Sequence, residues 1–324
     1  MQTTDRYFIA GGAGFIGSHL ARRLTANPDA HITVFDNFSS GRMEHFLEAA
    51  DRPNLKIVRG DIKDLPALTS AMQDVTHVFH FASNPDIAKA LRQPDVDFWE
   101  GTYLTQNILE AMLTAGVRKL SYASGSGVYG DTGDAPVFEN YAPLHPISTY
   151  GASKLAGETL ICAYCHMFDF QAVAFRFANV VGPNQTHGVT YDFVRRLREN
   201  PAKLRILGDG SQSKSYIHVS DVADAMLLAS PGKTAPFDVF NAATEDYVTV
   251  RQIADLVVSR LNLSNVAYEF TGGNRGWKGD VPIVRFDTRK LRSLGWANRR
   301  TSVQALTDAI DSEIQHVRGE KAVP

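Results

Sequence analysis

Tyr150 and Lys154 stand four residues apart in the segment Tyr-Gly-Ala-Ser-Lys. On a helix, residues with this spacing lie on one face, one turn from each other. A tyrosine hydroxyl is a poor base because its ordinary pKa is about 10, and a nearby ammonium group lowers that pKa by stabilising the phenolate. The pair therefore predicts abstraction of a hydroxyl proton, with Tyr150 as the base and Lys154 as the group that tunes it. The alternative is an exposed Tyr and Lys that share a helix face by chance.

Three glycines, Gly11, Gly14 and Gly17, lie between an apolar run at the N-terminus and a helical pattern. Such a turn lets backbone N–H groups approach a pyrophosphate, and the helix N-terminus adds partial positive charge. The spacing is G-x-x-G-x-x-G rather than the more familiar G-x-G-x-x-G. We expect an anion site here, and a simple tight turn is the alternative.

Asp36 ends the second apolar run, where an acid can bond the ribose hydroxyls of an adenosine. A carboxylate there repels a 2′-phosphate, so the residue favours NAD over NADP, although Arg42 lies near enough to soften that preference. The glycine turn, Asp36 and the Tyr150–Lys154 pair together predict a nucleotide-binding oxidoreductase core with NAD as cofactor.

Alternating strand and helix patterns must position these residues, and they predict βαβ units with a parallel sheet. The expected strands are Tyr7–Ala10, His31–Phe35, Leu55–Arg59, His77–Phe81, Lys119–Ala123 and Ala172–Phe175. The expected helices are Thr102–Ala115, Tyr150–Met167, Tyr191–Glu199 and Ser302–Val317. The predicted fold is α/β, a Rossmann-type doubly wound parallel sheet with a smaller C-terminal α/β lobe. We expect residues 1–178 to form the cofactor-binding domain, with 214–241 packing back on it, and 179–324 to form mainly the substrate lobe.

The composition excludes several classes of partner. The 324 residues are 44% hydrophobic and carry a net charge of −2, with no basic block that would suggest nucleic acid. We find no basic amphipathic stretch and no apolar run near the roughly 18 residues of a membrane span. The N-terminus also lacks a signal-peptide pattern, so we expect a cytoplasmic protein.

The cysteines and histidines predict no metal site. Cys162 and Cys165 form a C-x-x-C on one helix face, which we interpret as small core residues. His80, His187 and His218 are scattered rather than placed at metal-ligand spacing, and we interpret them as structural.

Asp61 follows the third strand, where a carboxylate can meet an adenine edge. The alternative is a helix N-cap for the residues from Lys63 onward. The fourth strand ends in His80-Phe81-Ala82-Ser83, whose small residues let a cofactor pass close by.

With these residues assembled, the chain resembles the extended short-chain dehydrogenase/reductases, specifically the NAD-dependent nucleotide-sugar epimerase/dehydratase group and its UDP-glucose 4-epimerase-like members. The likeness covers nearly the whole length. It rests on GGAGFIG at 11–17, DNFSSG at 36–41, GDI at 60–62, HFAS at 80–83, SGSGVYG at 124–130, YGASK at 150–154, RFANVVGP at 176–183 and YIHVSD at 216–221.

The resemblance implies a set of cofactor-binding residues, with Lys154 also holding the nicotinamide ribose. They are Gly11, Gly14, Phe15, Ile16, Gly17, Asp36, Asn37, Ser39, Gly41, Asp61, Ile62, Phe81, Ala82, Ser83, Tyr150, Lys154 and Phe177. It also implies a homodimer, packed through the helices 102–115 and 150–167 into a four-helix bundle.

The chain departs from the group at Gly125. The group carries a Ser or Thr three residues before the Val of V-Y-G, and that side chain bonds the reacting hydroxyl. Ser124 and Ser126 flank the glycine, and we slightly favour Ser126 as the replacement because neighbouring glycines permit unusual backbone angles. The alternative is that both serines make turn hydrogen bonds alone.

The same stretch bears on the reaction. Related dehydratases and decarboxylases place acids just before V-Y-G, where this chain has Gly125, Ser126 and Gly127. Chemistry that needs only hydride out and hydride back fits, which favours C4 epimerisation of a UDP-hexose through a transient 4-keto sugar. A nucleotide-sugar dehydrogenase or 4,6-dehydratase is the alternative enzyme, and a non-catalytic NAD-binding regulator is the alternative from another class.

Four further residues are implied in binding a nucleotide-sugar. Asn179 matches an Asn that contacts the sugar-nucleotide in the group, and its alternative is a cap. Lys214 stands where the group has an Arg that grips the diphosphate, and lysine lacks the bidentate fork. Arg275 or Lys278 could supply a second cation, or both could be exposed loop charges. Ser124, Ser126 and Tyr150 complete the expected substrate contacts.

Overall fold

The computed structural model describes residues 5–49, 51–233 and 235–320. Its centre is a seven-stranded sheet in which every neighbouring pair is parallel, in the order β12-β7-β5-β4-β1-β2-β3. The strands are β1 (Arg6–Ala10), β2 (His31–Asp36), β3 (Leu55–Arg59), β4 (His77–His80), β5 (Lys119–Gly125), β7 (Gln171–Phe177) and β12 (Phe237–Ala242).

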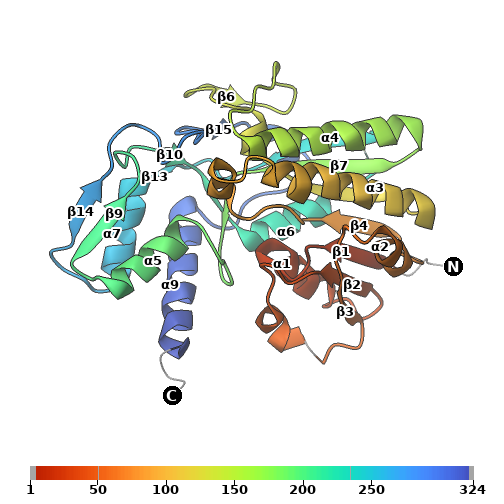
Figure 1. The fold of residues 1–324 in the computed structure, drawn as a ribbon, viewed down its shortest axis with the longest axis horizontal. Coiled ribbons are helices and arrows are strands. Elements are labelled where there is room, and N and C mark those ends of the chain that lie inside the picture. The colour runs from red at the N-terminus through yellow and green to blue at the C-terminus, as the bar shows by residue number, and fades with distance from the viewer. Residues whose placement is uncertain (1–4, 50, 234, 321–324) are drawn as a thin grey trace.

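Helices cover both faces of this sheet, so its central strands β1, β4, β5 and β7 are buried on both sides, as expected for parallel strands. Phe8 and Ala10 of β1 pack with α2 (Leu65–Ala71), α3 (Tyr103–Ala115) and α4 (Thr149–Met167). Ile9, which points the other way, packs with α1 (Phe15–Leu24) and α6 (Val219–Leu228). Figure 1 shows α3 and α4 side by side on one face and α1 and α6 on the other. The predicted Rossmann-type fold is confirmed.

The strand order reverses between β1 and β4, since β2 and β3 follow on one side and β5 and β7 on the other. In open α/β sheets, ligands bind at such a switch point, beyond the carboxyl ends of the strands. The glycine turn after β1 and the loop after β4 meet there.

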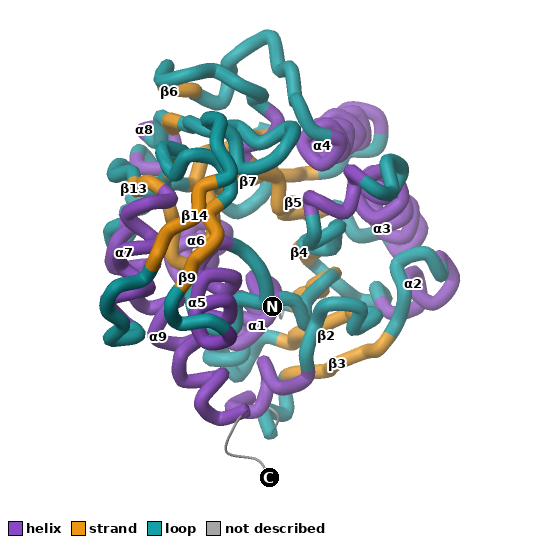
Figure 2. Tube along the Cα trace, turned by 60° about the vertical axis from the view of Figure 1, so that its left-hand side comes forward, coloured by secondary structure: helices purple, strands orange, loops and turns teal. Residues whose placement is uncertain are grey.

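A second group of elements has its own core. The helices α5 (Val189–Glu199), α7 (Val250–Arg260) and α9 (Ser302–Glu320) pack around Phe193, Ile253 and Ile310. The parallel pair β9 (Lys203–Ile206) and β14 (Ala267–Phe270) lies against them (Figure 2). The predicted division of the chain at residue 178 stays a prediction.

Short strand pairs join the two groups. β8 (Asn179–Val181) pairs with β11 (Tyr216–His218), β10 (Ser213–Lys214) with β13 (Val248–Thr249), and β6 (Pro136–Val137) with β15 (Arg285–Phe286). The short helix α8 (Arg289–Arg292) packs against β12. β8 was not predicted from the sequence, because its three residues carry too little pattern.

Several element ends differ from the expectation. A π-helical turn, Phe98–Thr102, precedes α3, and three 3-10 turns occupy Met43–Ala49, Ile87–Leu91 and Ser126–Val128. The alternative that Asp61 caps a helix from Lys63 is wrong, since α2 begins at Leu65 and Asp64 is its N-cap. His218 caps α6, with its side chain accepting from the Ser220 N–H.

Among the described residues, no helix is both long and apolar enough to span a membrane.

Candidate active site

The glycine turn packs too closely to admit side chains at two of its three positions. A Cβ on Gly11, whose φ is +72°, would lie 2.6 Å from the Ala82 nitrogen, and one on Gly17 would lie 2.6 Å from the Gly11 carbonyl oxygen. Gly14 is the N-cap of α1 and makes no side-chain cap, so the first N–H groups of the helix face outward from the turn. Phe15 is buried and Ile16 half-buried in the first turn of that helix. This cradle fits a pyrophosphate.

Asp36 fastens the cradle to the end of β2. Its carboxylate accepts hydrogen bonds from the backbone N–H of Ala13 at 2.9 Å and of Phe38 at 2.8 Å, and the residue is 8% exposed. Each carboxylate oxygen keeps a further lone pair for a ribose hydroxyl. The negative charge lies beside the glycine turn, as the preference for NAD requires.

The loops after β2 and β3 lie against each other near Asp36. Asn37 donates to the Asp61 carboxylate at 3.2 Å, and Asn37 Oδ1 accepts from the Ser39 N–H at 3.0 Å. A Cβ on Gly41 would lie 2.8 Å from the Ala13 side chain, so that glycine allows the loop to close on the turn. Ile62 is buried in the core beneath.

The loop after β4 runs beside the glycine turn. The Phe81 N–H donates to the Ala10 carbonyl at 2.9 Å, and Ala82 abuts Gly11. Ser83 follows and is hydrogen-bonded to the side chain of Tyr150. Phe177, at the end of β7, is 5% exposed and stacks on Phe175.

Tyr150 and Lys154 share one face of α4, as their spacing predicts. The Lys154 ammonium lies 5.6 Å from the centre of the Tyr150 ring and donates to the Ala123 carbonyl at 2.8 Å. The helix begins there because Ser148 caps it, accepting from the Gly151 N–H at 3.1 Å. The close contact of Gly127 with Gly151 brings the loop after β5 onto the same helix end.

Burial dominates the proton affinities of this pair. It lowers the pKa of Lys154 to about 8, although the charges of Asp97 and Glu158 act in the other direction. It raises the pKa of Tyr150 to about 12, while the bond to Ser83 lowers that pKa and the Asp97 charge raises it. The phenol is therefore protonated at neutral pH in the protein alone, and a cationic neighbour such as a nicotinamide ring would favour its phenolate.

Two buried carboxylates that influence the pair are engaged with protein partners. Glu158 accepts from Arg176 at 2.7 and 3.0 Å and from the Ser124 hydroxyl at 2.5 Å. Asp97 accepts from Asn84 at 2.9 Å and from the Thr149 hydroxyl at 2.6 Å. Both carboxylates therefore accept hydrogen bonds from protein groups and are not available as free acids.

The two candidate serines differ in their surroundings. The Ser124 hydroxyl points at Glu158, and the residue is 5% exposed. Ser126 is half-buried and begins a 3-10 turn. Between them, Gly125 has extended backbone, and a Cβ there would meet nothing within 4 Å.

The candidate substrate residues come from the second half of the chain. Asn179 begins β8, opposite Tyr216. Lys214 forms an ion pair with Asp280 at 2.7 Å. Arg275 pairs with Asp131, just beyond the loop that follows β5. Lys278 is exposed. The loop 275–280 thus lies close to the V-Y-G segment, and a diphosphate would have to share Lys214 with Asp280.

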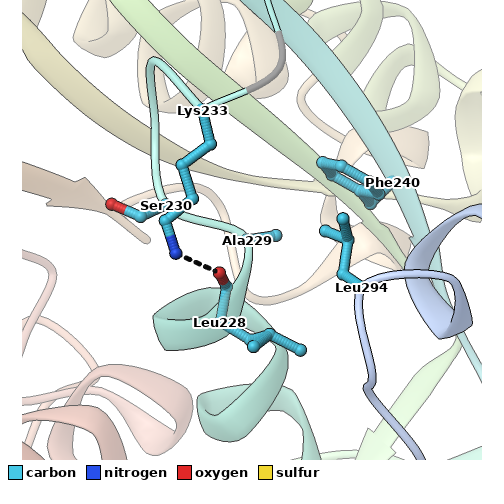
Figure 3. A pocket seen from close by; sticks show the side chains of 6 residues that line it. All are labelled: Leu228, Ala229, Ser230, Lys233, Phe240 and Leu294. Atoms are coloured by element: carbon cyan, nitrogen blue, oxygen red, sulfur yellow. Dashed lines mark hydrogen bonds between the residues drawn. The ribbon is translucent and has the colours of Figure 1, made fainter.

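A separate small pocket lies away from all these residues, between the end of α6, β12 and the turn after α8 (Figure 3). It is lined by Leu228, Ala229, Ser230, Lys233, Phe240 and Leu294. Lys233 donates to the Leu228 carbonyl at 3.1 Å, so its charged group is turned to the protein backbone.

Three residues of the site were missed in the sequence: Asn84, Asp97 and Glu158. Glu158 had a signal, because it continues the four-residue spacing of Tyr150 and Lys154 along one helix face. Asn84 and Asp97 had none, since their contact joins two irregular segments. The described residues contain no group of three or more His, Cys, Asp or Glu that could hold a metal, and both cysteines are free thiols.

A glycine turn that fits a pyrophosphate, an acid at the end of β2 and a Tyr–Lys pair, all at the switch point of a doubly wound sheet, are typical of a dinucleotide-dependent oxidoreductase core. A sequence model of the "NAD dependent epimerase/dehydratase family" matches residues 7–243. The chain belongs to this family, whose cofactor is NAD.

Individual proteins similar to this chain have names that fit the same family. A putative UDP-glucose 4-epimerase of Methanocaldococcus jannaschii is 31% identical over 295 residues, which are 89% of this chain and 92% of the relative. A crystal structure of a UDP-galactose 4-epimerase superposes with a TM-score of 0.83 at 36% identity, covering 96% of this chain and 99% of its own. The Thermus thermophilus UDP-glucose 4-epimerase in complex with NAD gives 0.84 at 28% identity, covering 95% and 99%.

Proposed function

We propose that the protein is an NAD-dependent nucleotide-sugar epimerase that inverts C4 of a UDP-hexose through a transient 4-keto sugar. The observation that carries the proposal is the Tyr150–Lys154 pair with Asp97 and Glu158 both bonded to protein groups. A 4,6-dehydratase needs an additional acid and base at neighbouring carbons, and these two carboxylates are not free to act as them. The similarity to UDP-sugar 4-epimerases supports the same reaction.

The residues at the switch point fit NAD. Gly11, Gly14 and Gly17 would admit the pyrophosphate, Asp36 would bond the adenosine ribose, and Lys154 would hold the nicotinamide ribose. When bound, NAD supplies a reversible hydride acceptor and a positive charge beside Tyr150.

The protein's own residues then have separate tasks. Tyr150 takes the proton of the sugar C4 hydroxyl and returns it after the sugar has presented its other face. Lys154 lowers the pKa of that phenol by its charge. Asn179, Lys214, Arg275 and Lys278 bind the nucleotide and diphosphate, which keeps the substrate anchored while the hexose turns.

The test is to incubate the purified protein, without added NAD, with UDP-glucose, UDP-galactose and their uronic and N-acetyl relatives, and to follow products by proton NMR. Interconversion of C4 epimers is the expected result. Loss of water or net formation of NADH would instead identify the dehydratase or dehydrogenase. A protein that binds NAD and converts no sugar would be a regulator.

The proposal extends to assembly and location. The helices α3 and α4 lie side by side at the surface, and Phe98, Trp99 and Met167 at their ends are 52%, 45% and 70% exposed. We propose that a second copy packs there to form a four-helix homodimer, and that the protein works in the cytoplasm. Light scattering that gives a monomer mass would contradict the dimer, and fractionation of cells that places the protein outside the cytoplasm would contradict the location.

A further inference from the structure

The loop after β5 leaves the side of the reacting hydroxyl without a side chain. At Gly125 the backbone is extended, with φ −166° and ψ 171°, and a Cβ would have open space. The neighbouring Ser124 hydroxyl is held by Glu158, away from that space. A sugar oxygen beside Tyr150 therefore gains no hydroxyl partner from position 124 or 125.

The loop after β4 brings a different hydroxyl to Tyr150. Ser83 is half-buried and hydrogen-bonded to the Tyr150 side chain. The residue before it, Ala82, abuts Gly11 of the pyrophosphate cradle. Ser83 thus contacts the expected base and follows directly after the residue that touches the glycine turn.

A buried carboxylate fixes this arrangement. Asp97 is 1% exposed and accepts from Asn84, which follows Ser83, and from Thr149, which precedes Tyr150. Asn84 also closes its own turn, donating to the Asp86 carbonyl at 2.8 Å and accepting from the Asp86 N–H at 3.1 Å. Asp97 therefore ties the backbone that carries Ser83 to the backbone that carries Tyr150.

We propose that Ser83 is a catalytic residue that hydrogen-bonds the same sugar oxygen that Tyr150 deprotonates, and that Asp97 is the positioning residue that holds the two hydroxyls together. The inference rests on the proposed function. A serine hydroxyl has one proton to donate. Ser83 donates it to the Tyr150 oxygen in the protein alone and to the sugar oxygen once the substrate is bound. Ser83 keeps its own proton, and the proton transferred passes between the sugar and Tyr150.

The first test is Ser83→Ala in the NAD-loaded protein. Removal of one preorganised donor should lower kcat about 10²-fold, while the NAD content released on denaturation stays the same. In the free enzyme the bond to Ser83 lowers the pKa of Tyr150. In the Ser83→Ala variant the rising limb of the pH profile of kcat/KM should therefore move to higher pH. Ser70→Ala, an exposed serine of α2, is the matched control and should leave kcat and the profile unchanged.

The second test is rescue. Position 125 has extended backbone and room for a side chain. Gly125→Ser placed in the Ser83→Ala protein should therefore recover at least about tenfold of the lost rate, the scale of one regained hydrogen bond to a group that becomes charged. Asp97→Asn should also lower kcat, but should move the rising limb to lower pH, since the Asp97 charge raises the pKa of Tyr150. A purely structural role would not produce opposite shifts.

The outcomes separate the two proposals. A wild-type protein that converts no nucleotide-sugar would overturn the proposed function, and the Ser83 role with it. If the wild type is active and Ser83→Ala keeps the wild-type kcat, the Ser83 role alone is overturned. The same holds if Ser126→Ala, and not Ser83→Ala, lowers kcat.

Discussion

Tyr150 can act as a base only when a positive charge compensates for its burial. The buried phenol has its pKa raised to about 12, and Lys154 lies across one helical turn with its pKa lowered to about 8. Below pH 8 the ammonium remains charged for most molecules, so Lys154 supports the phenolate best in that range. Proton transfer in the site therefore depends on the Tyr150 hydroxyl group rather than on its aromatic ring.

Tyr150→Phe should therefore slow the reaction strongly while NAD stays bound. We expect kcat to fall about 10²- to 10⁴-fold, the usual contribution of a positioned acid–base group. The NAD content should remain that of the wild type, as measured after denaturation. A variant that retains the wild-type rate with NAD bound would show that another group abstracts the proton.

Asp36 should govern the choice between NAD and NADP. Asp36→Asn removes the charge that repels a 2′-phosphate but keeps one oxygen for the Ala13 N–H. We expect NAD affinity to fall about 10- to 10²-fold, the scale of one lost hydrogen bond to a charged group, and the ratio of NADP to NAD affinity to rise. Calorimetric titration of the cofactor-free protein measures both, and an unchanged ratio would contradict the assignment.

Among single residues, those that act together within one short segment could be predicted from the sequence. Tyr150, Lys154 and the glycines belong to single segments, so their relation was predictable from helical and turn geometry. Ser83 and Asp97 meet Tyr150 from loops 67 and 53 positions earlier in the chain, and single-sequence patterns do not encode which loops meet. The roles of all predicted site residues stay predictions.

Among the elements, α4 and β7 are joined by a buried ion pair. Arg176 and Glu158 have side chains that are each 4% exposed, and two nitrogens of the guanidinium contact the carboxylate. The pair also fixes Ser124 behind the site. Breaking it would leave one buried charge without a partner.

We expect Arg176→Met to lower the free energy of unfolding by about 3–5 kcal/mol, as for other broken buried pairs. Urea denaturation measures it. The matched control is Asp311→Asn, which breaks the exposed Arg260–Asp311 pair and should cost about 1 kcal/mol or less. Equal losses in both variants would mean that burial does not set the cost of this pair.

The long elements were predictable, and the short ones were not. The six predicted strands all occur, with ends shifted by up to two residues, because buried parallel strands form continuous apolar runs. The π-helical turn at Phe98–Thr102 and the strand β8 depend on tertiary contacts of a few residues. No periodicity extends far enough there to reveal them.

For the whole molecule, acid should be more damaging than base near neutrality. His77 and His80 are buried, and burial lowers the pKa of each to about 3. Their unfolded pKa is about 6.5, so between pH 6.5 and 3 the unfolded chain binds more protons than the folded protein. The stabilising contribution of these two histidines to the free energy of unfolding is therefore complete above pH 6.5 and is lost as the pH falls below it.

The two histidines together should cost about 4 kcal/mol of unfolding free energy between pH 7 and pH 5. Urea denaturation at both values measures the drop. His77→Phe should reduce it by about 2 kcal/mol, and His166→Gln, at an exposed position of α4, should leave it unchanged. A wild-type protein whose stability is flat over this range would contradict neutral burial of these side chains.

The chain passes repeatedly between its two cores. It leaves the large sheet after β7, returns with α6 and β12, departs again with α7, comes back through β15 and α8, and ends in α9. A protein engineer could not exchange the residues after 178 as one unit, because a single cut there would remove the edge strand β12 from the sheet. New sugar preferences would have to be built by grafting individual loops, such as 124–130 and 272–280, onto an intact framework.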